Sequence, residues 1–222
     1  MNTPRVTPNG ETVKRGYRSD LRAAQAQQTR RRVVTAAADL FVATGYGGTS
    51  VDAIAAAAGV SRKTVFTVVG GKAELLSSAL DFAIAGDDAP VPLAERPEVA
   101  ELMQLDDAGA LLTAWAQLIT DIDARVGALF AALDAASSAD QGARELFEKL
   151  HAQRRDGARA VVAAVAALGP LRDGLSRSAA TDLACLFSDP SWHRHLVGVH
   201  GWSGRRFATW LAGTLQQQLL TA

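Results

Sequence analysis

Cysteine is almost absent from this sequence of 222 residues, and the sequence contains no long apolar run. The single cysteine, Cys185, can form neither an internal disulfide nor a cysteine-based zinc site. Uninterrupted apolar stretches of about 18 residues, as a membrane span requires, are missing. Residues 1–5 are too polar to begin a secretory signal. We therefore expect a cytoplasmic protein with no membrane partner.

Catalytic and metal-binding patterns are missing as well. His193 and His195 stand two residues apart on a presumed helix and therefore face different directions. The run Gly70-Gly71-Lys72 lacks the further glycine and the Ser or Thr of a phosphate-binding loop. Neither a nucleophile elbow nor a pair of catalytic carboxylates is present. The sequence predicts no enzyme activity, no cofactor and no metal site.

Much of the hydrophobic content, which is 48% of the residues, is alanine, and alanine favours helix. We therefore predict an all-α fold class. A chain of 222 residues has room for one large or two small domains, because a typical domain has about 100–200 residues. Turn signals and apolar periodicity divide the chain into a flexible basic arm at 1–18, a small helical domain at 19–76 and a larger one at 77–222.

A formal net charge of zero conceals a division along the chain. Residues 1–76 contain eleven Lys and Arg against five Asp and Glu, so this segment carries +6 and the remainder −6. Basic side chains gain affinity for nucleic acids by releasing counterions condensed on the phosphates. The asymmetry favours a polyanion as partner of the N-terminal segment, although a solvated charged face is an alternative interpretation.

Periodicity and turn residues predict the helices of both domains. The first begins at Ser19 or Asp20 and ends at Gly45, and Thr49 and Asp52 have the spacing of a capping box for the next. An acidic, proline-bearing loop or short helix is expected at 86–97. The helices expected after it are 108–136, with a possible break near Asp121, 141–168, 175–188, 190–197 and 204–220.

Residues 49–68 have the pattern of a helix-turn-helix. Gly59 can take the left-handed conformation that a tight turn at 58–60 requires, and Ser61 caps a second short helix. The small core between the two helices consists of Ile54, Ala55, Val60, Val65 and Val68. The second helix is thereby held outward, where its polar side chains can reach base edges and phosphates. These side chains are Ser61, Arg62, Lys63, Thr64 and Thr67.

Residues 30–76 resemble the DNA-binding signature of the TetR (tetracycline repressor) family. The matching residues, in order and spacing, are Leu40-Phe41, Gly45-Tyr46, Thr49-Ser50-Val51, Ile54-Ala55, Ala57-Ala58-Gly59-Val60-Ser61, Thr64-Val65-Phe66 and Lys72-Ala73-Glu74-Leu75-Leu76. The resemblance implies a DNA-binding domain at 19–76 and an effector-binding and dimerisation domain at 77–222. The alternative is a three-helix subdomain whose basic residues have no such role.

The same resemblance implies which residues contact DNA. They are Thr49, Ser61, Arg62, Lys63, Thr64, Phe66 and Lys72; Ser50 and Thr67 are further candidates for DNA contacts. The family usually has Tyr at the position of Phe66 and another aromatic residue at that of Val69. Without the hydroxyl, Phe66 is expected to pack its ring against the sugar-phosphate backbone.

The C-terminal end also resembles that of many such regulators, in which the last two long helices form a four-helix dimer interface. The residues concerned are Asp189-Pro190-Ser191-Trp192, Gly201-Trp202-Ser203 and Trp210-Leu211. Two apolar stripes fit this use, namely Ala180, Leu183, Ala184 and Phe187 in one helix and Phe207, Trp210, Leu211, Thr214 and Leu215 in the other. We expect a homodimer; the alternative is that the last stripe only closes the monomer core.

Polar residues interrupt one apolar stripe of the predicted helix 141–168. His151 and Arg154 follow Phe147 by one and two turns, and polar groups on an apolar stripe need partners. They are either satisfied core or rim groups, or they line an effector pocket suited to a largely apolar ligand. The candidate lining is Phe82, Leu111, Trp115, Phe130, Phe147, His151 and Arg154.

Three functions compete on these observations. The favoured one is a dimeric repressor that binds double-stranded operator DNA and is released by a small, largely apolar ligand. The second is an activator or effector-independent DNA binder on the same scaffold, which only the pocket separates from the first. The third is a helical enzyme with an incidental basic end, against which the missing catalytic constellation argues.

Overall fold

The computed structural model of the protein describes residues 10–87 and 91–221, with side chains from residue 23 onward. Within these residues, helices are the only extended secondary structure, accompanied by one isolated bridge between Leu171 and Leu220. This confirms the predicted all-α fold class. None of the described helices combines the length and the apolar character that crossing a membrane requires.

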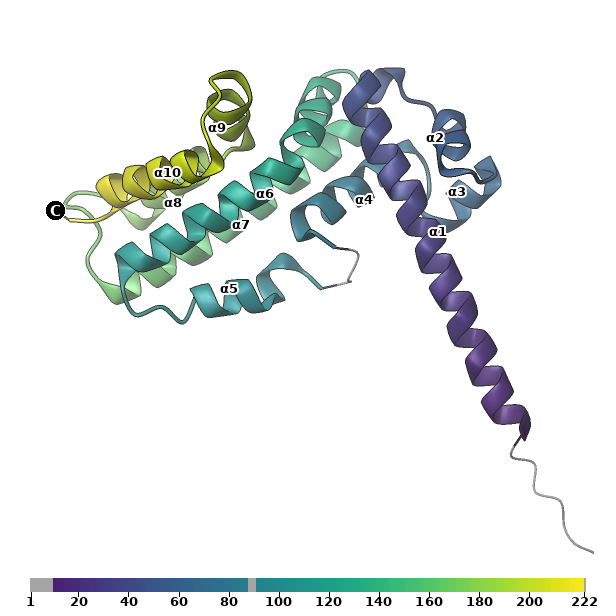
Figure 1. Cartoon of the computed structure of the whole chain (residues 1–222). Coiled ribbons are helices and arrows are strands. Elements are labelled where there is room, and N and C mark those ends of the chain that lie inside the picture. Colours follow the sequence, from purple (N-terminus) through teal and green to yellow (C-terminus); the bar gives the residue numbers. More distant parts are fainter. Residues whose placement is uncertain (1–9, 88–90, 222) are drawn as a thin grey trace, which may run out of the picture.

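Four helices make up the N-terminal part, from which the outer end of α1 projects (Figure 1). They are α1 (Gly10–Gly48), α2 (Val51–Ala58), α3 (Arg62–Val68) and α4 (Lys72–Ala85). The inner half of α1 carries the predicted stripe, in which Val33, Ala37 and Phe41 are completely buried against the neighbouring helices. Gly45 interrupts α1 with φ 71° and ψ 169°, so the regular helix ends where the sequence predicts.

The helix α1 begins earlier than predicted, at Gly10. Residues 10–18, expected to belong to a flexible arm, are therefore helical. Glu11, Lys14 and Arg15 are good helix formers, and no proline lies between residue 9 and the predicted start at Ser19, so the helix continues in front of that residue. Residues 1–9 of the predicted arm lie outside the described residues.

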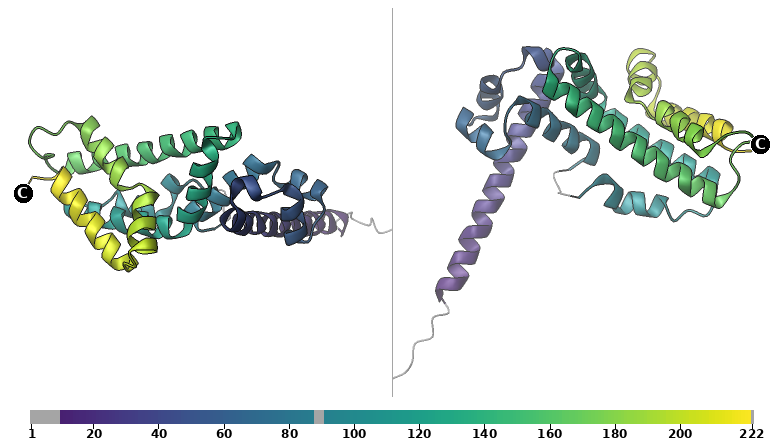
Figure 2. Two further views of the ribbon diagram at one scale, coloured as in Figure 1. Left: turned by 90° about the horizontal axis from the view of Figure 1, so that it is seen from above. Right: turned by 180° about the vertical axis from the view of Figure 1, so that it is seen from behind.

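Two long antiparallel helices run along the C-terminal part, as Figure 2 shows. They are α6 (Ala108–Ser137) and α7 (Gln141–Leu168). The break expected near Asp121 is absent, because Asp121 faces solvent and accepts a hydrogen bond of 2.9 Å from Gln117 one turn earlier without disturbing the helix. The remaining elements are a 3₁₀ turn (Leu93–Glu95), α5 (Pro97–Leu102), α8 (Arg177–Phe187), α9 (Pro190–His193), a π-helical turn (Arg194–Val199) and α10 (Gly204–Leu219).

Two separate apolar cores lie at the two ends of the α6–α7 pair. The first core joins α1–α4 to one end of the pair, where Leu133 and Leu146 are buried. The second joins α8 and α10 to the other end, around Leu112 and Val162. The middle of the pair therefore lies between the DNA-facing end expected from the sequence and the C-terminal helices.

The second core buries only part of the apolar stripe on α10 that was predicted to form the dimer interface. Phe207, Leu211 and Leu215 are completely buried within the single chain, whereas Trp210 and Thr214 are only partly buried. The first three side chains therefore close the monomer core, as the alternative interpretation held. A helix has room for two adjacent apolar stripes, and the period alone does not show which of them a partner helix in the same chain covers.

Candidate DNA-binding surface and buried polar cluster

The turn between α2 and α3 depends on Gly59. This residue has φ 64° and ψ 39°, the left-handed conformation that the sequence predicts. Arg32 of α1 donates from Nη2 to the carbonyl of Ala58, and a Cβ on Gly59 would lie 3.0 Å from the same nitrogen. The turn is therefore fixed both by its own backbone and by α1, which holds α3 at a defined angle to the rest of the domain.

Ser61 caps the N-terminus of α3. Its Oγ accepts a hydrogen bond of 3.1 Å from the backbone N–H of Thr64, and the two hydroxyl groups lie 2.8 Å apart. Val65 is completely buried and anchors the helix from below. The first turn of α3 therefore keeps its helical shape up to an exposed end, where backbone N–H groups favour an anion.

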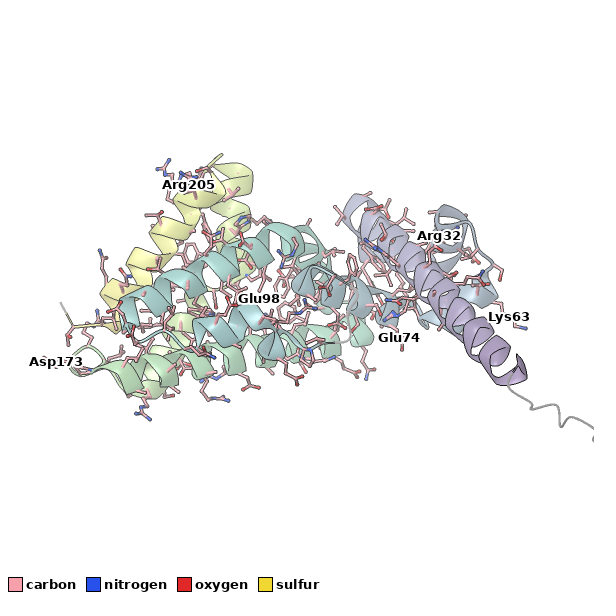
Figure 3. All side chains as sticks on the ribbon, turned by 60° about the horizontal axis from the view of Figure 1, so that its bottom comes forward. Arg32, Lys63, Glu74, Glu98, Asp173 and Arg205 are labelled. Atoms are coloured by element: carbon pink, nitrogen blue, oxygen red, sulfur yellow. The ribbon has the colours of Figure 1, made fainter. Side chains whose placement is uncertain are left out.

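The outer face of α3 is exposed. Lys63 and Thr67 are exposed, and Phe66 retains 47% of its accessible surface, which is unusual for a large apolar side chain. Figure 3 shows Lys63 at the outer edge of the N-terminal part, far from the labelled Asp173 and Arg205 of the C-terminal part. This face offers donors and an aromatic ring to a flat or grooved partner.

Arg62 is held on the same face by two weak contacts. Its guanidinium forms an ion pair with Asp52 of α2 and lies over the Phe66 ring, with Cζ 5.5 Å from the centroid. Both members of the ion pair are mostly exposed, so the pair contributes little, about 0–1 kcal/mol. A phosphate or a guanine edge can therefore replace Asp52 as the partner of Arg62.

The structure places Thr49 and Ser50 differently from the sequence prediction. Thr49 is buried, and its hydroxyl donates toward the carbonyls at the end of α1, 2.8 Å from Gly45 O and 3.2 Å from Leu40 O. The cap of α2 is Ser50, whose Oγ accepts from Ala53 N at 3.1 Å. The predicted capping box of Thr49 and Asp52 is therefore wrong by one residue, and the Thr49 side chain does not lie on the exposed surface.

Lys72 links this surface to the C-terminal part through Tyr46. The Lys72 Nζ lies 4.2 Å from the Tyr46 ring centroid, and the Tyr46 hydroxyl donates to Asp140 Oδ1 at 3.3 Å. Burial and the nearby Asp140 carboxylate raise the pKa of Tyr46 to about 12, so the hydroxyl remains a donor at neutral pH. Asp140 also caps α7 by accepting from Ala143 N at 2.9 Å. The start of α4 and the start of α7 thus share one chain of contacts.

A cluster of buried polar side chains lies in the middle of the α6–α7 pair. Arg154 of α7 forms an ion pair of 2.8 Å with Asp189, at the N-terminus of α9, and donates to His151 Nδ1 at 2.8 Å. Its Cζ also lies 5.5 Å from the Phe130 ring centroid. Asp123 of α6, only 3% exposed, interacts with the charges of both Arg154 and Asp189. These four polar groups come from three separate segments of the chain.

The protonation of this cluster follows from its burial. Burial raises the pKa of Asp123 to about 8; Arg154 opposes the shift and Asp189 adds to it. Burial and then Arg154 lower the pKa of His151. Because a guanidinium can only donate, His151 Nδ1 is the acceptor, and the proton of the neutral ring is on Nε2. At neutral pH the cluster thus holds a largely protonated Asp123 and a neutral His151.

The seven residues predicted to line one effector pocket do not all come together. Phe82, Phe130 and Phe147 pack against the first core, and the His151 ring lies tilted against Phe147 with ring centroids 4.2 Å apart. Leu111 and Trp115 instead belong to the second core, near α10. Helical periodicity could not show that the apolar stripe of α6 serves two different cores.

A known protein family matches the part of the sequence that forms the exposed surface. The model of the family described as "Bacterial regulatory proteins, tetR family" matches residues 33–79, from the buried half of α1 to the middle of α4. Residues 33–79 therefore carry a DNA-binding domain of the TetR type. The TetR family is one of DNA-binding regulators and not of enzymes, as the sequence predicts.

A curated transcriptional regulator is similar to a short stretch of this chain. The HTH-type transcriptional regulator SrpR of Pseudomonas putida is 43% identical over 58 residues, which are 26% of this chain and 27% of SrpR. The match therefore spans about a quarter of that relative.

Solved structures of transcriptional regulators share the fold over most of the chain. A transcriptional regulator from Saccharomonospora viridis, solved with choline, is 18% identical, with a TM-score of 0.65 over 88% of this chain and all of its own. FadR from Bacillus subtilis, solved with stearoyl-CoA, is 14% identical, with a TM-score of 0.63 over 83% of this chain and 96% of its own. At these identities the likeness concerns the fold, an N-terminal helix-turn-helix followed by a helical C-terminal domain.

Asp123 and Asp189 were missed by the sequence analysis. Asp123 lies on the face of α6 that also carries Val126 and Phe130, so the rule that singled out His151 and Arg154 on an apolar stripe applies to it equally. Asp189 was named only within the C-terminal resemblance, and in the structure it caps α9. Among the described residues, no three His, Cys, Asp or Glu side chains are grouped as metal ligands would be.

Proposed function

We propose that this chain is a dimeric repressor that reads double-stranded operator DNA with α3 and is released by a small, largely apolar ligand in its C-terminal domain. The observation that carries the proposal is the outer face of α3. It presents Lys63, Phe66 and Thr67 to solvent on a capped helix, within a segment of charge +6. An exposed, basic, capped second helix of a helix-turn-helix is suited to the major groove.

Each exposed residue then has a role that follows from its place. Lys63, Arg62 and Thr67 lie on the outer face, where they can donate to base edges. Ser61 and Thr64, at the N-terminus of α3, and Ser50, at that of α2, lie where a phosphate is favoured. Phe66 packs on the sugar-phosphate backbone, and Lys72 contacts a phosphate from the start of α4.

Dimerisation is supported by exposed apolar side chains near α8 and α10. Leu186 is 54% exposed and Trp192 36% exposed, and the Trp192 indole donates to the Leu186 carbonyl at 3.0 Å. Trp210 of α10 continues this patch, with its ring centroid 6.0 Å from that of Trp192. An exposed apolar patch of this kind marks an interaction site. A two-fold dimer would place two α3 helices in successive major grooves, about 34–36 Å apart.

Ligand sensing is supported by the solved relatives and by the middle of the α6–α7 pair. The relatives were solved with choline and with stearoyl-CoA, two molecules of different chemistry. A regulator of this fold therefore accommodates various small molecules. In this chain the aromatic rings of Phe130 and Phe147, with His151 and Arg154, lie where two long helices could enclose one.

Release from DNA would follow from the contacts between α4 and α7. A Cβ on Gly142 of α7 would lie 3.1 Å from the Ala73 Cβ of α4, so the two helix starts are in close contact next to Lys72. Tyr46 and Asp140 connect the same two ends. A ligand that prefers one tilt of α7 therefore shifts Lys72 and α3. A coupling of about 1–3 kcal/mol lowers operator affinity about 5–150-fold.

The experiment that tests the proposal measures binding to an operator selected from random duplexes. We expect Lys63→Ala and Thr64→Ala each to weaken binding to that operator by about 1–3 kcal/mol, because they remove donors from the reading helix. Arg205→Ala, which removes an exposed basic residue at the opposite end of the molecule, is the control and leaves binding unchanged. If the double variant binds as tightly as the wild type, α3 is not the reading helix.

A further inference from the structure

Unfilled space lies beside the polar cluster, next to Gly127. Gly127 is buried on α6, one turn after Asp123, yet a Cβ built on it would have no heavy atom within 4 Å, apart from its own helix backbone and chain neighbours. Asp123, Gly127 and Phe130 share one face of α6. In the antiparallel pair, Phe130 lies beside Phe147, and Asp123 lies near Arg154. The space at Gly127 is therefore between the aromatic rings and the charged groups.

Three polar atoms of the cluster have no hydrogen-bond partner within the described residues, although they are buried. They are Asp123 Oδ2, His151 Nε2 and Arg154 Nε. Buried polar atoms are nearly always hydrogen-bonded, since an unmade bond costs about 1–3 kcal/mol. Asp123 is the most deeply buried of these residues, and when it is ionised its carboxylate oxygen requires a donor. A polar group that enters this space has to satisfy that oxygen.

The charges of the cluster decide which kind of donor fits. Arg154 and Asp189 neutralise each other in their ion pair, and His151 is neutral. On α9, His193 is buried edge-on against Phe207, and burial lowers its pKa, so it adds no charge. An ionised Asp123 therefore leaves the group at −1, which a bound monocation would neutralise. A bound anion would be a second uncompensated charge beside the ionised carboxylate and a single one beside the protonated carboxyl, in both cases at a large energetic cost in a region of low dielectric.

We propose that this site binds an organic cation, an amine or amidine on a compact apolar skeleton, whose N–H donates to Asp123 Oδ2. The proposal rests on the proposed function, in which the C-terminal domain holds the ligand, and it names the class of that ligand. Phe130 and Phe147 supply the apolar lining, and an aromatic face is favourable beside a cation.

Binding should be linked to a proton, because the cation and the proton compete for the same carboxylate. In the free protein, burial raises the pKa of Asp123 to about 8, so at pH 7 the carboxyl is mostly protonated. A cation must displace that proton. We therefore expect the affinity to rise up to about tenfold per pH unit below pH 8 and to become constant above it, with nearly one proton released per ligand at pH 7.

The test uses matched probes on the full-length protein. Phenethylamine, phenethyl alcohol and phenylacetate form one set, and hexylamine, hexanol and hexanoate form a second. Isothermal titration calorimetry at pH 7, in two buffers that differ in ionisation enthalpy, gives both the affinity and the number of protons released. We expect one or both amines to bind at least tenfold more tightly than their alcohol and acid counterparts, with proton release. An alcohol or acid that binds as tightly as its amine overturns the proposal, and so does the absence of saturable binding by either amine.

Two variants locate the site. Asp123→Asn keeps the shape of the side chain but removes the charge, so the preference for amines and the proton release should disappear; Asp121→Asn, exposed on the same helix, should keep both. Gly127→Leu fills the adjacent space and should abolish binding of every probe. If Asp123→Asn does not fold, Gly127→Leu and the proton count of the wild type still decide. Wild-type affinity in Gly127→Leu would place the site elsewhere.

Repeating the titrations with operator DNA separates this proposal from the proposed function. An amine that binds with the same affinity in the presence and absence of DNA supports the ligand class and contradicts release. An acid or alcohol that binds preferentially and weakens DNA binding contradicts the ligand class and supports release.

Discussion

Charged side chains lie both on the outer face of α3 and in the middle of the α6–α7 pair. On α3 they are exposed, whereas between α6 and α7 they are mostly buried. On α3, Lys63 and Thr67 are exposed, and the ion pair of Arg62 with Asp52 lies in solvent. Between α6 and α7, the ion pair of Arg154 with Asp189 is mostly buried. Charges that remain solvated cost the fold almost nothing and exchange easily for phosphates. Charges that are buried must be matched one by one, so they can discriminate between ligands but make the fold depend on pH.

The two regions therefore predict different results from substitution. A change on the exposed surface should alter affinity and leave stability as it is. A change in the buried cluster should alter stability first. Three sets of substitutions, in order of decreasing expected effect, distinguish effects on affinity from effects on stability.

The largest effect on operator affinity is expected from substitutions in the apolar patch of the proposed dimer interface. Replacing Leu186 and Trp210 by Glu should give folded monomers, because Leu186 is exposed and Trp210 is only partly buried, at the edge of the second core. Operator affinity should fall on the order of a hundredfold or more, since one reading helix then binds without the second. Light scattering and gel shifts measure the two quantities. Leu168→Glu, an exposed site at the end of α7, is the control. A double variant that stays dimeric would place the interface elsewhere.

The second effect concerns the pH dependence of stability. The pKa of Asp123 is raised to about 8, so the native state keeps a proton that the unfolded chain loses near pH 4. The free energy of unfolding should therefore fall between pH 4 and pH 8, on the order of a few kcal/mol, and level off above pH 8.

Asp123→Asn cannot ionise, so this contribution should be absent from its urea unfolding curves over the same pH range. Asp121→Asn, exposed on the same helix, should keep the wild-type dependence. Equal pH profiles for Asp123→Asn and the wild type would show that Asp123 is not buried in its protonated form.

The smallest effect is expected at Lys72. Lys72→Ala removes one phosphate contact, so the slope of log affinity against log salt should decrease by about one unit, equally for cognate and unrelated duplexes. Lys149→Ala, on the exposed side of α7, should leave the slope unchanged. Loss of affinity confined to particular base sequences would contradict a phosphate contact at this position.

Most of the N-terminal part could be predicted because its signals are local. The turn at Gly59 and the cap at Ser61 depend on contacts within a few residues, and both are present as predicted. Thr49 and Ser50 show the limit of such signals. Adjacent hydroxyl residues fit the same capping pattern, and only the position of the α1 carbonyls decided that Thr49 turns inward.

The C-terminal part shows the same limit over longer distances. The sequence by itself determined that α6, α7 and α10 are helices, which of their faces are apolar, and that His151 and Arg154 interrupt one of them. Only the tertiary structure decided that Asp123 and Asp189 join these two residues, that Gly127 leaves space beside them, and that Leu111 and Trp115 belong to another core. Periodicity fixes the direction of a side chain within its own helix, whereas the register between helices depends on the packing of the whole domain.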